Sequence, residues 1–277
     1  MLRSCLPILL LALILPLSGG EAAPIATGQR VLICGHSFHV YIANPLGTLA
    51  KEAGIAGHTL LESQFLPGSE VSEHWALTGG KDKVRPILKA GGVDVLTLAP
   101  AWGMPDPAID RFVDLGCATN PTLRVFLQQS WTGFDGKQDR KLTPAQRDAM
   151  TVEELQTALD RQTPLFRQQA EVINKRLGRR VVYVAPVGQA VLALRAQVIA
   201  GAVPGITTQS QLFRDSLGHP LDEVRNLVTY VFFACIYRRS PVGMASLKSR
   251  DPRVEAILQD IAWKTVRAAP DAGVQGD

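Results

Sequence analysis

Short apolar runs alternate with longer amphipathic stretches along most of the 277-residue chain. The apolar runs have the length and composition of buried strands, which we expect at 31–34, 59–65, 93–99, 123–129 and 180–185. The intervening stretches show helical spacing and predict helices at 40–53, 70–77, 81–90, 107–118, 151–178 with a break or kink at Pro164, 188–199, 222–237 and 252–268. This alternation predicts an α/β fold, a three-layer sandwich with a five-stranded parallel sheet between helices.

The first 23 residues have the pattern of a secretory signal peptide. Arg3 supplies a positive charge, residues 6–17 form an apolar run too short for a membrane span, and small residues follow. We place cleavage after Ala23 or Ala26 and expect residues 24–277 to form a single exported domain, either periplasmic or secreted. No later stretch is long and apolar enough to predict a membrane span.

Composition indicates a well-buried globular protein, with 46% hydrophobic and 19% charged residues. The formal net charge is +4, but the basic residues are scattered among acidic ones, which argues against a nucleic-acid partner. Three cysteines follow the signal peptide, Cys34, Cys117 and Cys235, each in an apolar segment without metal-ligand spacing. We interpret them as buried hydrophobic residues with at most one disulfide.

The sequence Gly35-His36-Ser37-Phe38-His39 follows the first expected strand, where the chain turns toward the first helix. Gly35 permits a sharp turn, and a serine at the helix start would meet free N–H groups and the positive end of the helix dipole. We therefore expect Ser37 to be presented as a nucleophile. The alternative is an ordinary helix N-cap, for which serine is a preferred residue.

A second polar group of residues, Asp215 and His219, lies in the loop before the expected helix 222–237. A histidine can accept the proton of a serine, and a carboxylate can orient the histidine, so Ser37, His219 and Asp215 are the candidate catalytic residues. Taken alone, Asp215 could instead cap a turn and His219 could be a loop histidine.

A long polar segment at 131–150 follows the fourth expected strand. Its position at the carboxyl end of a parallel strand, where such sheets bind ligands, makes it a candidate lid. A surface excursion without a role is the alternative.

These features together resemble the SGNH, or GDSL-like, hydrolase family. Its Gly-x-Ser corner is matched by Gly35-His36-Ser37, its glycine after the second strand by Gly68, and its final Asp/His block by Asp215 and His219. The resemblance spans nearly the whole mature chain. It implies a flavodoxin-like sheet with the site at the carboxyl ends of the strands, no cofactor, and an oxyanion held by the backbone N–H groups of Ser37 and Gly68.

The chain departs from the family pattern at three places. His36 stands where the name-giving motif has Asp, three residues instead of two separate Asp215 from His219, and residues 99–103 lack the Gly-x-Asn block whose asparagine donates to the oxyanion. The candidates for a substitute donor are His36, His39, the indole N–H of Trp102, and Gln129.

Two alternatives belong to other chemical classes. His36 and His39, with His74 and His219 elsewhere, would supply enough imidazole for zinc, but the spacing is not a recognised zinc pattern and we expect no metal. The other alternative is a catalytically weak or inactive domain that binds a glycan or a protein partner. The leading prediction is an exported serine hydrolase that cleaves a small acyl ester, with carbohydrate deacetylation as an attractive substrate class.

Overall fold

The computed structural model describes residues 21–247, 249 and 251–275, so most of the expected signal peptide lies outside the described residues. The five strands form one parallel sheet with the spatial order β2-β1-β3-β4-β5. Their bounds are β1 (Arg30–Gly35), β2 (Thr59–Phe65), β3 (Val95–Leu98), β4 (Arg124–Gln128) and β5 (Val182–Ala185). This order is the flavodoxin-like one, in which ligands bind beyond the carboxyl ends of the strands near β1 and β3.

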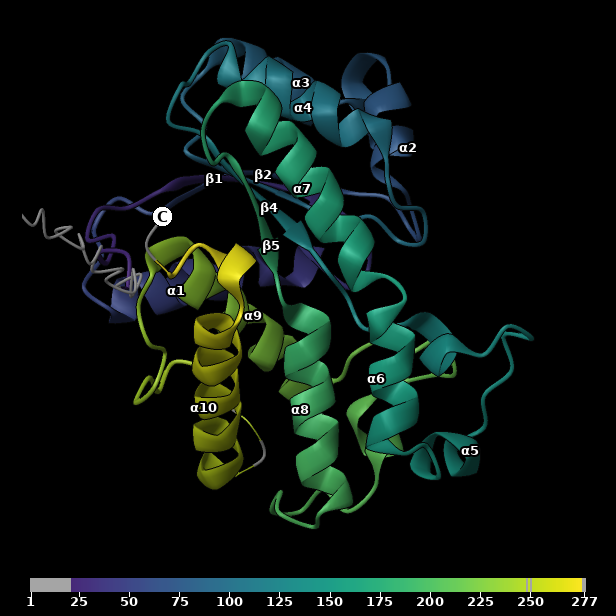
Figure 1. Ribbon diagram of the computed structural model, residues 1–277. Helices are drawn as coiled ribbons and strands as arrows, with labels where there is room; N and C mark the ends of the chain where they lie inside the picture. The colour runs from purple at the N-terminus through teal and green to yellow at the C-terminus, as the bar shows by residue number, and fades with distance from the viewer. Residues whose placement is uncertain (1–20, 248, 250, 276–277) are drawn as a thin grey trace, which may run out of the picture.

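Helices cover both faces of the sheet and complete the expected three-layer sandwich (Figure 1). One layer holds α2 (Val71–Ala76), α3 (Val84–Ala90), α4 (Pro107–Cys117) and α7 (Thr163–Leu177). The other holds α1 (Ala43–Glu52), α8 (Val187–Ile199), α9 (Asp222–Tyr237) and α10 (Pro252–Ala268). The predicted fold class is therefore confirmed.

Burial explains why the apolar runs are continuous. Strands β3 and β5 are buried at every position and β1 at every position after Arg30, because helices cover both faces of the sheet. Helix α9 contacts α1, α8 and α10, and thirteen of its residues are buried, so it is apolar on nearly every side.

The stretch 151–178, where a break or kink was expected at Pro164, is two helices, α6 (Val152–Asp160) and α7. The break falls at Arg161 and Gln162, and Pro164 lies in the first turn of α7, where the missing N–H has no helical partner to lose. The segment 131–150 contains two short helices, η3 (Gly133–Gly136) and α5 (Pro144–Asp148). The remaining 3₁₀ helices are η1 (Val40–Ile42), η2 (Gly79–Lys81), η4 (Gln209–Leu212) and η5 (Pro270–Ala272).

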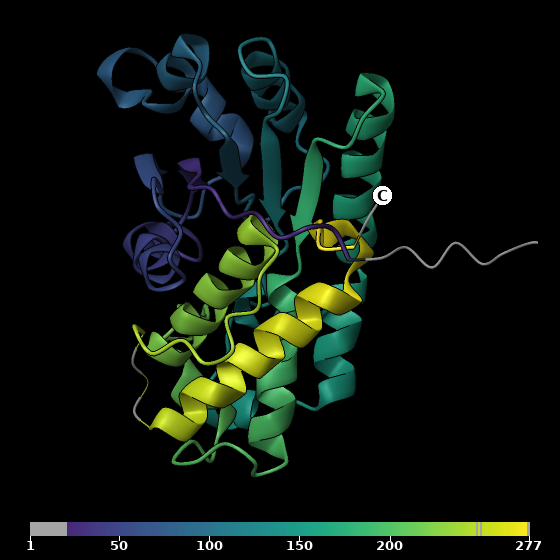
Figure 2. The same cartoon turned by 90° about the vertical axis from the view of Figure 1, so that its left-hand side faces the viewer.

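The N-terminal end of the described chain pairs with the C-terminal end (Figure 2). The Ala22 N–H donates to the Val274 carbonyl at 2.8 Å, so the segment just before the expected cleavage site is ordered against the domain. Cys34, Cys117 and Cys235 are all free thiols. Within the described residues, no helix combines the length and apolar character needed to cross a bilayer.

Candidate active site

The structure brings Ser37, His219 and Asp215 into one line although 182 residues separate the first two. Ser37 Oγ lies 2.9 Å from His219 Nε2, and His219 Nδ1 lies 2.6 Å from Asp215 Oδ2. A carboxylate can only accept, so Nδ1 carries the proton and Nε2 is left as the acceptor for the Ser37 hydroxyl. This arrangement is the one that deprotonation of a serine by a histidine requires.

Ser37 lies in a turn rather than at the start of a helix, which corrects the expected local structure. The chain leaves β1 at Gly35, and the first helical residue is Val40, in η1. The N–H groups of His39 and Val40 both donate to the His36 carbonyl, so the turn is closed beneath a half-buried Ser37. Gly35 is required here because a Cβ would lie 2.8 Å from that of Ala99 and 3.0 Å from the His39 ring.

The carboxylate of Asp215 is held in its charged form by hydrogen bonds. Partial burial would raise its pKa, but the N–H groups of His219 and Gly218, both 3.1 Å from Oδ1, and the His219 ring together hold the pKa below its usual value. Arg214 adds a positive group, with Nε 3.9 Å from Oδ2. Asp215 is therefore prepared to accept from the imidazole and to stabilise its protonated form.

The Ser37 hydroxyl opens onto a small pocket of about 30 Å³. Its lining residues are His36, Ser37, Phe38, Gly68, Ala101, Trp102, Ser130, Trp131, Gly133 and Leu217. Phe38 stacks on Trp131 at 4.6 Å between ring centroids and meets the His219 ring edge-on at 5.3 Å. Aromatic groups therefore wall the pocket and confine the imidazole.

Gly68 lies in the same pocket as Ser37, as the sequence predicts. Its φ of +57° is a left-handed conformation, and a Cβ there would meet nothing within 4 Å, so the backbone angle alone favours glycine. Among the described residues, neither the Ser37 nor the Gly68 N–H has a hydrogen-bond acceptor. Two backbone donors are therefore available at the pocket.

The loop after β3 contributes no comparable donor. Trp102 lines the pocket but is 53% exposed at its mouth, where the Arg140 guanidinium lies 5.5 Å from the ring centroid. The backbone N–H groups of Trp102 and Gly103 both donate to Glu70 Oε1 at 2.8 Å. Both N–H groups are therefore already hydrogen-bonded within the protein, and from this loop the side chains of Ala101 and Trp102 line the pocket.

The other candidate donors take different positions. His36 lines the pocket, and its Nδ1 accepts from the Phe38 N–H at 3.2 Å, which places the ring proton on a buried Nε2 without a hydrogen bond of normal geometry. Burial lowers the pKa of His36 to about 4, against a smaller raising effect of the Pro100 carbonyl, so the ring is neutral. The structure does not bring Gln129 to this pocket. Gln129 lines a separate cavity of about 370 Å³ between α7, α8 and α10.

His39 and His74 hold the framework beneath the site. The His39 ring lies 2.8 Å from Gln128 Oε1 and 2.7 Å from Thr97 Oγ1, and burial lowers its pKa to about 3. The His74 ring lies 2.8 Å from Ser69 Oγ, beside Gly68. The described residues contain no group of three or more side chains placed to hold a metal ion.

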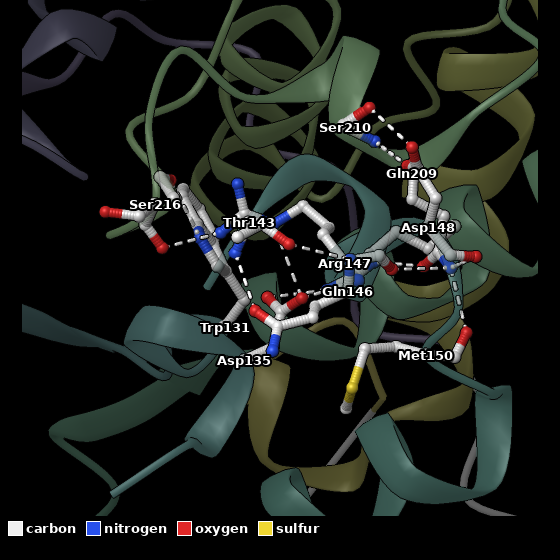
Figure 3. Close-up of polar contacts among 12 residues, drawn as sticks. Trp131, Asp135, Thr143, Gln146, Arg147, Asp148, Met150, Gln209, Ser210 and Ser216 are labelled. Atoms are coloured by element: carbon white, nitrogen blue, oxygen red, sulfur yellow. Dashed lines mark hydrogen bonds and ion pairs between the residues drawn. The ribbon is translucent and has the colours of Figure 1, made fainter. Parts of the chain in front are cut away.

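The segment 131–150, expected as a candidate lid, is packed into the protein at several points. Trp131, Asp135 and Arg147 are buried, and Figure 3 shows Asp135 close to Arg147. Arg195 of α8 donates to both carboxylate oxygens of Asp135, at 2.9 and 2.8 Å. Residues 138–141 are exposed. Sequence reasoning missed Glu70, Arg147 and the Asp135–Arg195 pair, because their partners are backbone groups and side chains remote along the chain.

The sequence matches no protein-family model and no curated protein. The fold, however, has solved counterparts. A DUF4886 family protein from Bacteroides uniformis has a TM-score of 0.56 at 14% identity, over 87% of this chain and 95% of that one. At 14% identity this likeness concerns the fold, a five-stranded parallel sheet between helices.

Two further structures are similar at lower scores. A protein from Slackia heliotrinireducens assigned to the SGNH hydrolases has a TM-score of 0.45 at 15% identity, over 74% of this chain and 97% of that one. A carbohydrate esterase family 3 protein from Talaromyces cellulolyticus has a TM-score of 0.43 at 11% identity, over 76% and 97%. At these identities the likeness concerns the fold alone, and the reaction has to be argued from the site.

Proposed function

We propose that this protein is an exported serine hydrolase that cleaves small acyl esters. The observation that carries the proposal is the line of hydrogen-bond distances from Ser37 Oγ to His219 Nε2, at 2.9 Å, and from His219 Nδ1 to Asp215 Oδ2, at 2.6 Å. Capping or packing alone does not require three side chains from two loops to lie in the order that this chemistry needs.

The proposed reaction has two halves. His219 Nε2 takes the Ser37 hydroxyl proton as Oγ attacks the ester carbonyl carbon, and the alcohol leaves with that proton, which gives an acyl-Ser37 intermediate. Water then gives a proton to His219 and attacks the acyl carbon, after which Ser37 Oγ leaves and regains the proton. Asp215 keeps the imidazole in the required tautomer throughout, and the N–H groups of Ser37 and Gly68 stabilise the oxyanion.

The dimensions of the pocket support a small acyl group. The open volume beside Ser37 is small, about 30 Å³, and the stacked rings of Phe38 and Trp131 limit its extension. The exposed face of Trp102 at the mouth suits the apolar face of a sugar ring, which supports acylated carbohydrate as the substrate class. Export rests on the N-terminal sequence, and mass spectrometry of the secreted chain should find Pro24 or Thr27 as its first residue.

A serine-reactive phosphonate probe tests the proposal directly. We expect labelling of the wild type, loss of labelling in Ser37→Ala and in His219→Ala, and retained labelling in Ser130→Ala. Ser130 is the matched control because its side chain lines the same pocket without a histidine partner. A folded wild type that neither labels nor hydrolyses acetate esters would refute the enzyme and favour the glycan- or protein-binding alternative.

A further inference from the structure

The main chain of the loop that carries Asp215 and His219 is held from outside the loop. Arg147 donates from Nη1 to the Asp215 carbonyl at 2.6 Å and from Nη2 to the Ser216 carbonyl at 2.8 Å. One guanidinium therefore holds two successive peptide groups, including that of the residue whose side chain orients His219.

The next two carbonyls of the loop are held by the same segment. The Phe134 N–H donates to the Leu217 carbonyl at 3.0 Å, and the Trp131 indole N–H donates to the Gly218 carbonyl at 3.1 Å. Four successive carbonyls, 215–218, thus accept hydrogen bonds from residues 131–147. We call these four donors the loop clamp.

The guanidinium of Arg147 is itself fixed from behind. Arg147 is 3% exposed, its Nε lies 3.4 Å from Asp135 Oδ2, and its Cζ lies 4.7 Å from the centroid of the Phe213 ring. Burial lowers its pKa and the Asp135 carboxylate opposes that effect, and an arginine remains charged at neutral pH. Figure 3 shows Arg147 between Asp135 and the loop at Ser216.

The loop clamp accounts for a departure seen in the sequence. Three residues separate Asp215 from His219, one more than is common in the family that the chain resembles, and the longer turn needs an additional constraint to return the ring to its carboxylate. Gly218 takes a φ of +101°, and a Cβ there would lie 3.2 Å from the Trp131 indole nitrogen and 3.6 Å from Arg147 Nη2. A glycine at this position lets the clamp approach the main chain.

We infer that Arg147 is a positioning residue for the Ser37–His219–Asp215 line, an inference that rests on the proposed function. Arg147 touches no reacting atom. It acts by fixing the peptide groups at 215 and 216, so that the Asp215 carboxylate stays within hydrogen-bond distance of the His219 ring and the ring stays within hydrogen-bond distance of Ser37. A displacement of about 1 Å in such a line costs on the order of 10²-fold in rate.

The test compares Arg147→Met with Arg124→Met. Arg124 is the control because it is a partly buried arginine that also donates to a backbone carbonyl, that of Ile236 at 2.9 Å, without contact to the site loop. We expect Arg147→Met to lower kcat about 10²-fold with little change in KM, and Arg147→Lys, which keeps the charge but not the two-point geometry, to fall between. Arg124→Met should keep its kcat per folded molecule.

A second readout does not depend on turnover. The proton in the short hydrogen bond between His219 Nδ1 and Asp215 should give a low-field NMR resonance, which we expect to shift or broaden in Arg147→Met and to persist in Arg124→Met. Equal kcat values and equal resonances in the two variants would overturn the inference. An inactive, unlabelled wild type whose resonance still depends on Arg147 would refute the proposed function alone. If Arg147→Met does not fold, Arg147→Lys and Trp131→Phe carry the same comparison.

Discussion

Replacing Asp215 by asparagine separates the orientation of His219 from the shape of its loop. Asp215 Oδ1 accepts from two backbone N–H groups at 3.1 Å, and Oδ2 faces His219 Nδ1 at 2.6 Å. The oxygen of an asparagine can keep both backbone bonds only if its NH₂ group faces the imidazole. His219 must then accept at Nδ1 and carry its proton on Nε2, toward Ser37.

The size of the effect follows from the two possible orientations of the amide. Turning its oxygen toward His219 would leave two backbone N–H groups without an acceptor, at about 1–3 kcal/mol for each group that water does not reach. The wrong tautomer is therefore favoured, and an imidazole that cannot accept the serine proton lowers kcat by on the order of 10⁴-fold in triads of this type. This corresponds to about 5 kcal/mol of barrier.

Initial rates on a chromogenic acetate ester measure this effect, with thermal unfolding as the check on folding. Asp94→Asn is the matched control. Asp94 also accepts from a backbone N–H, that of Arg30, forms an ion pair with the Arg30 guanidinium, and has a lowered pKa. We expect its rate to stay within twofold of the wild type. An Asp215→Asn variant within tenfold of the wild type would refute the tautomer argument.

Three further outcomes follow from the geometry. Gly68→Ala should lower kcat by about 10²-fold or more, because the strained backbone would displace the N–H donor. Gly79 is the control, since its φ is +58° against +57° for Gly68 and its surroundings are equally open, so Gly79→Ala should destabilise the fold without changing kcat. Equal rates in the two variants would contradict this. The free energy of unfolding should fall as the pH drops from 6.5 toward about 4, and His36 should account for up to ~3 kcal/mol of that fall. The reason is that His36 binds a proton in the unfolded state but stays neutral when its ring is buried. The variant His36→Gln should therefore show a smaller change of the urea unfolding midpoint with pH. Gly133→Ala places a Cβ 2.7 Å from the Trp102 ring, so it should change KM for bulky alcohols more than for small ones in a panel of acetate esters.

Much of the fold could be predicted because each element has a local pattern. The buried strands are continuous apolar runs, and the Gly35 corner and Gly68 turn are short-range features of the backbone. The proline at 164 indicated a break in the stretch 151–178, and the structure has that break at Arg161 and Gln162, just before the proline. Ser37 was expected at a helix start, although the helix begins three residues later at Val40.

The site was less predictable where side-chain direction decides contact. Gln128 and Gln129 are adjacent, and successive side chains of an extended chain point to opposite faces. Gln128 reaches His39 and the Phe38 carbonyl beneath the site, whereas Gln129 turns to the cavity between α7 and α8. The role of Arg147 could not be predicted from the sequence, because its partners are peptide carbonyls 68 and 69 residues away. Every residue has a peptide carbonyl, so the residue types at 215 and 216 do not indicate this contact.

Two departures from the family pattern have separate structural counterparts, and they differ in what they imply for the rate. The longer turn before His219 is matched by donors from residues 131–147, which restore a short contact to Asp215, so its geometry is kept. The missing asparagine is matched by Glu70, which uses the backbone N–H groups of Trp102 and Gly103 to fix the loop and leaves them unavailable to an oxyanion. One such donor contributes about 2.7–4 kcal/mol, so an enzyme with only the Ser37 and Gly68 N–H groups should turn over about 10²–10³-fold more slowly than one with three donors. A slow but triad-dependent esterase is the activity that both observations together predict.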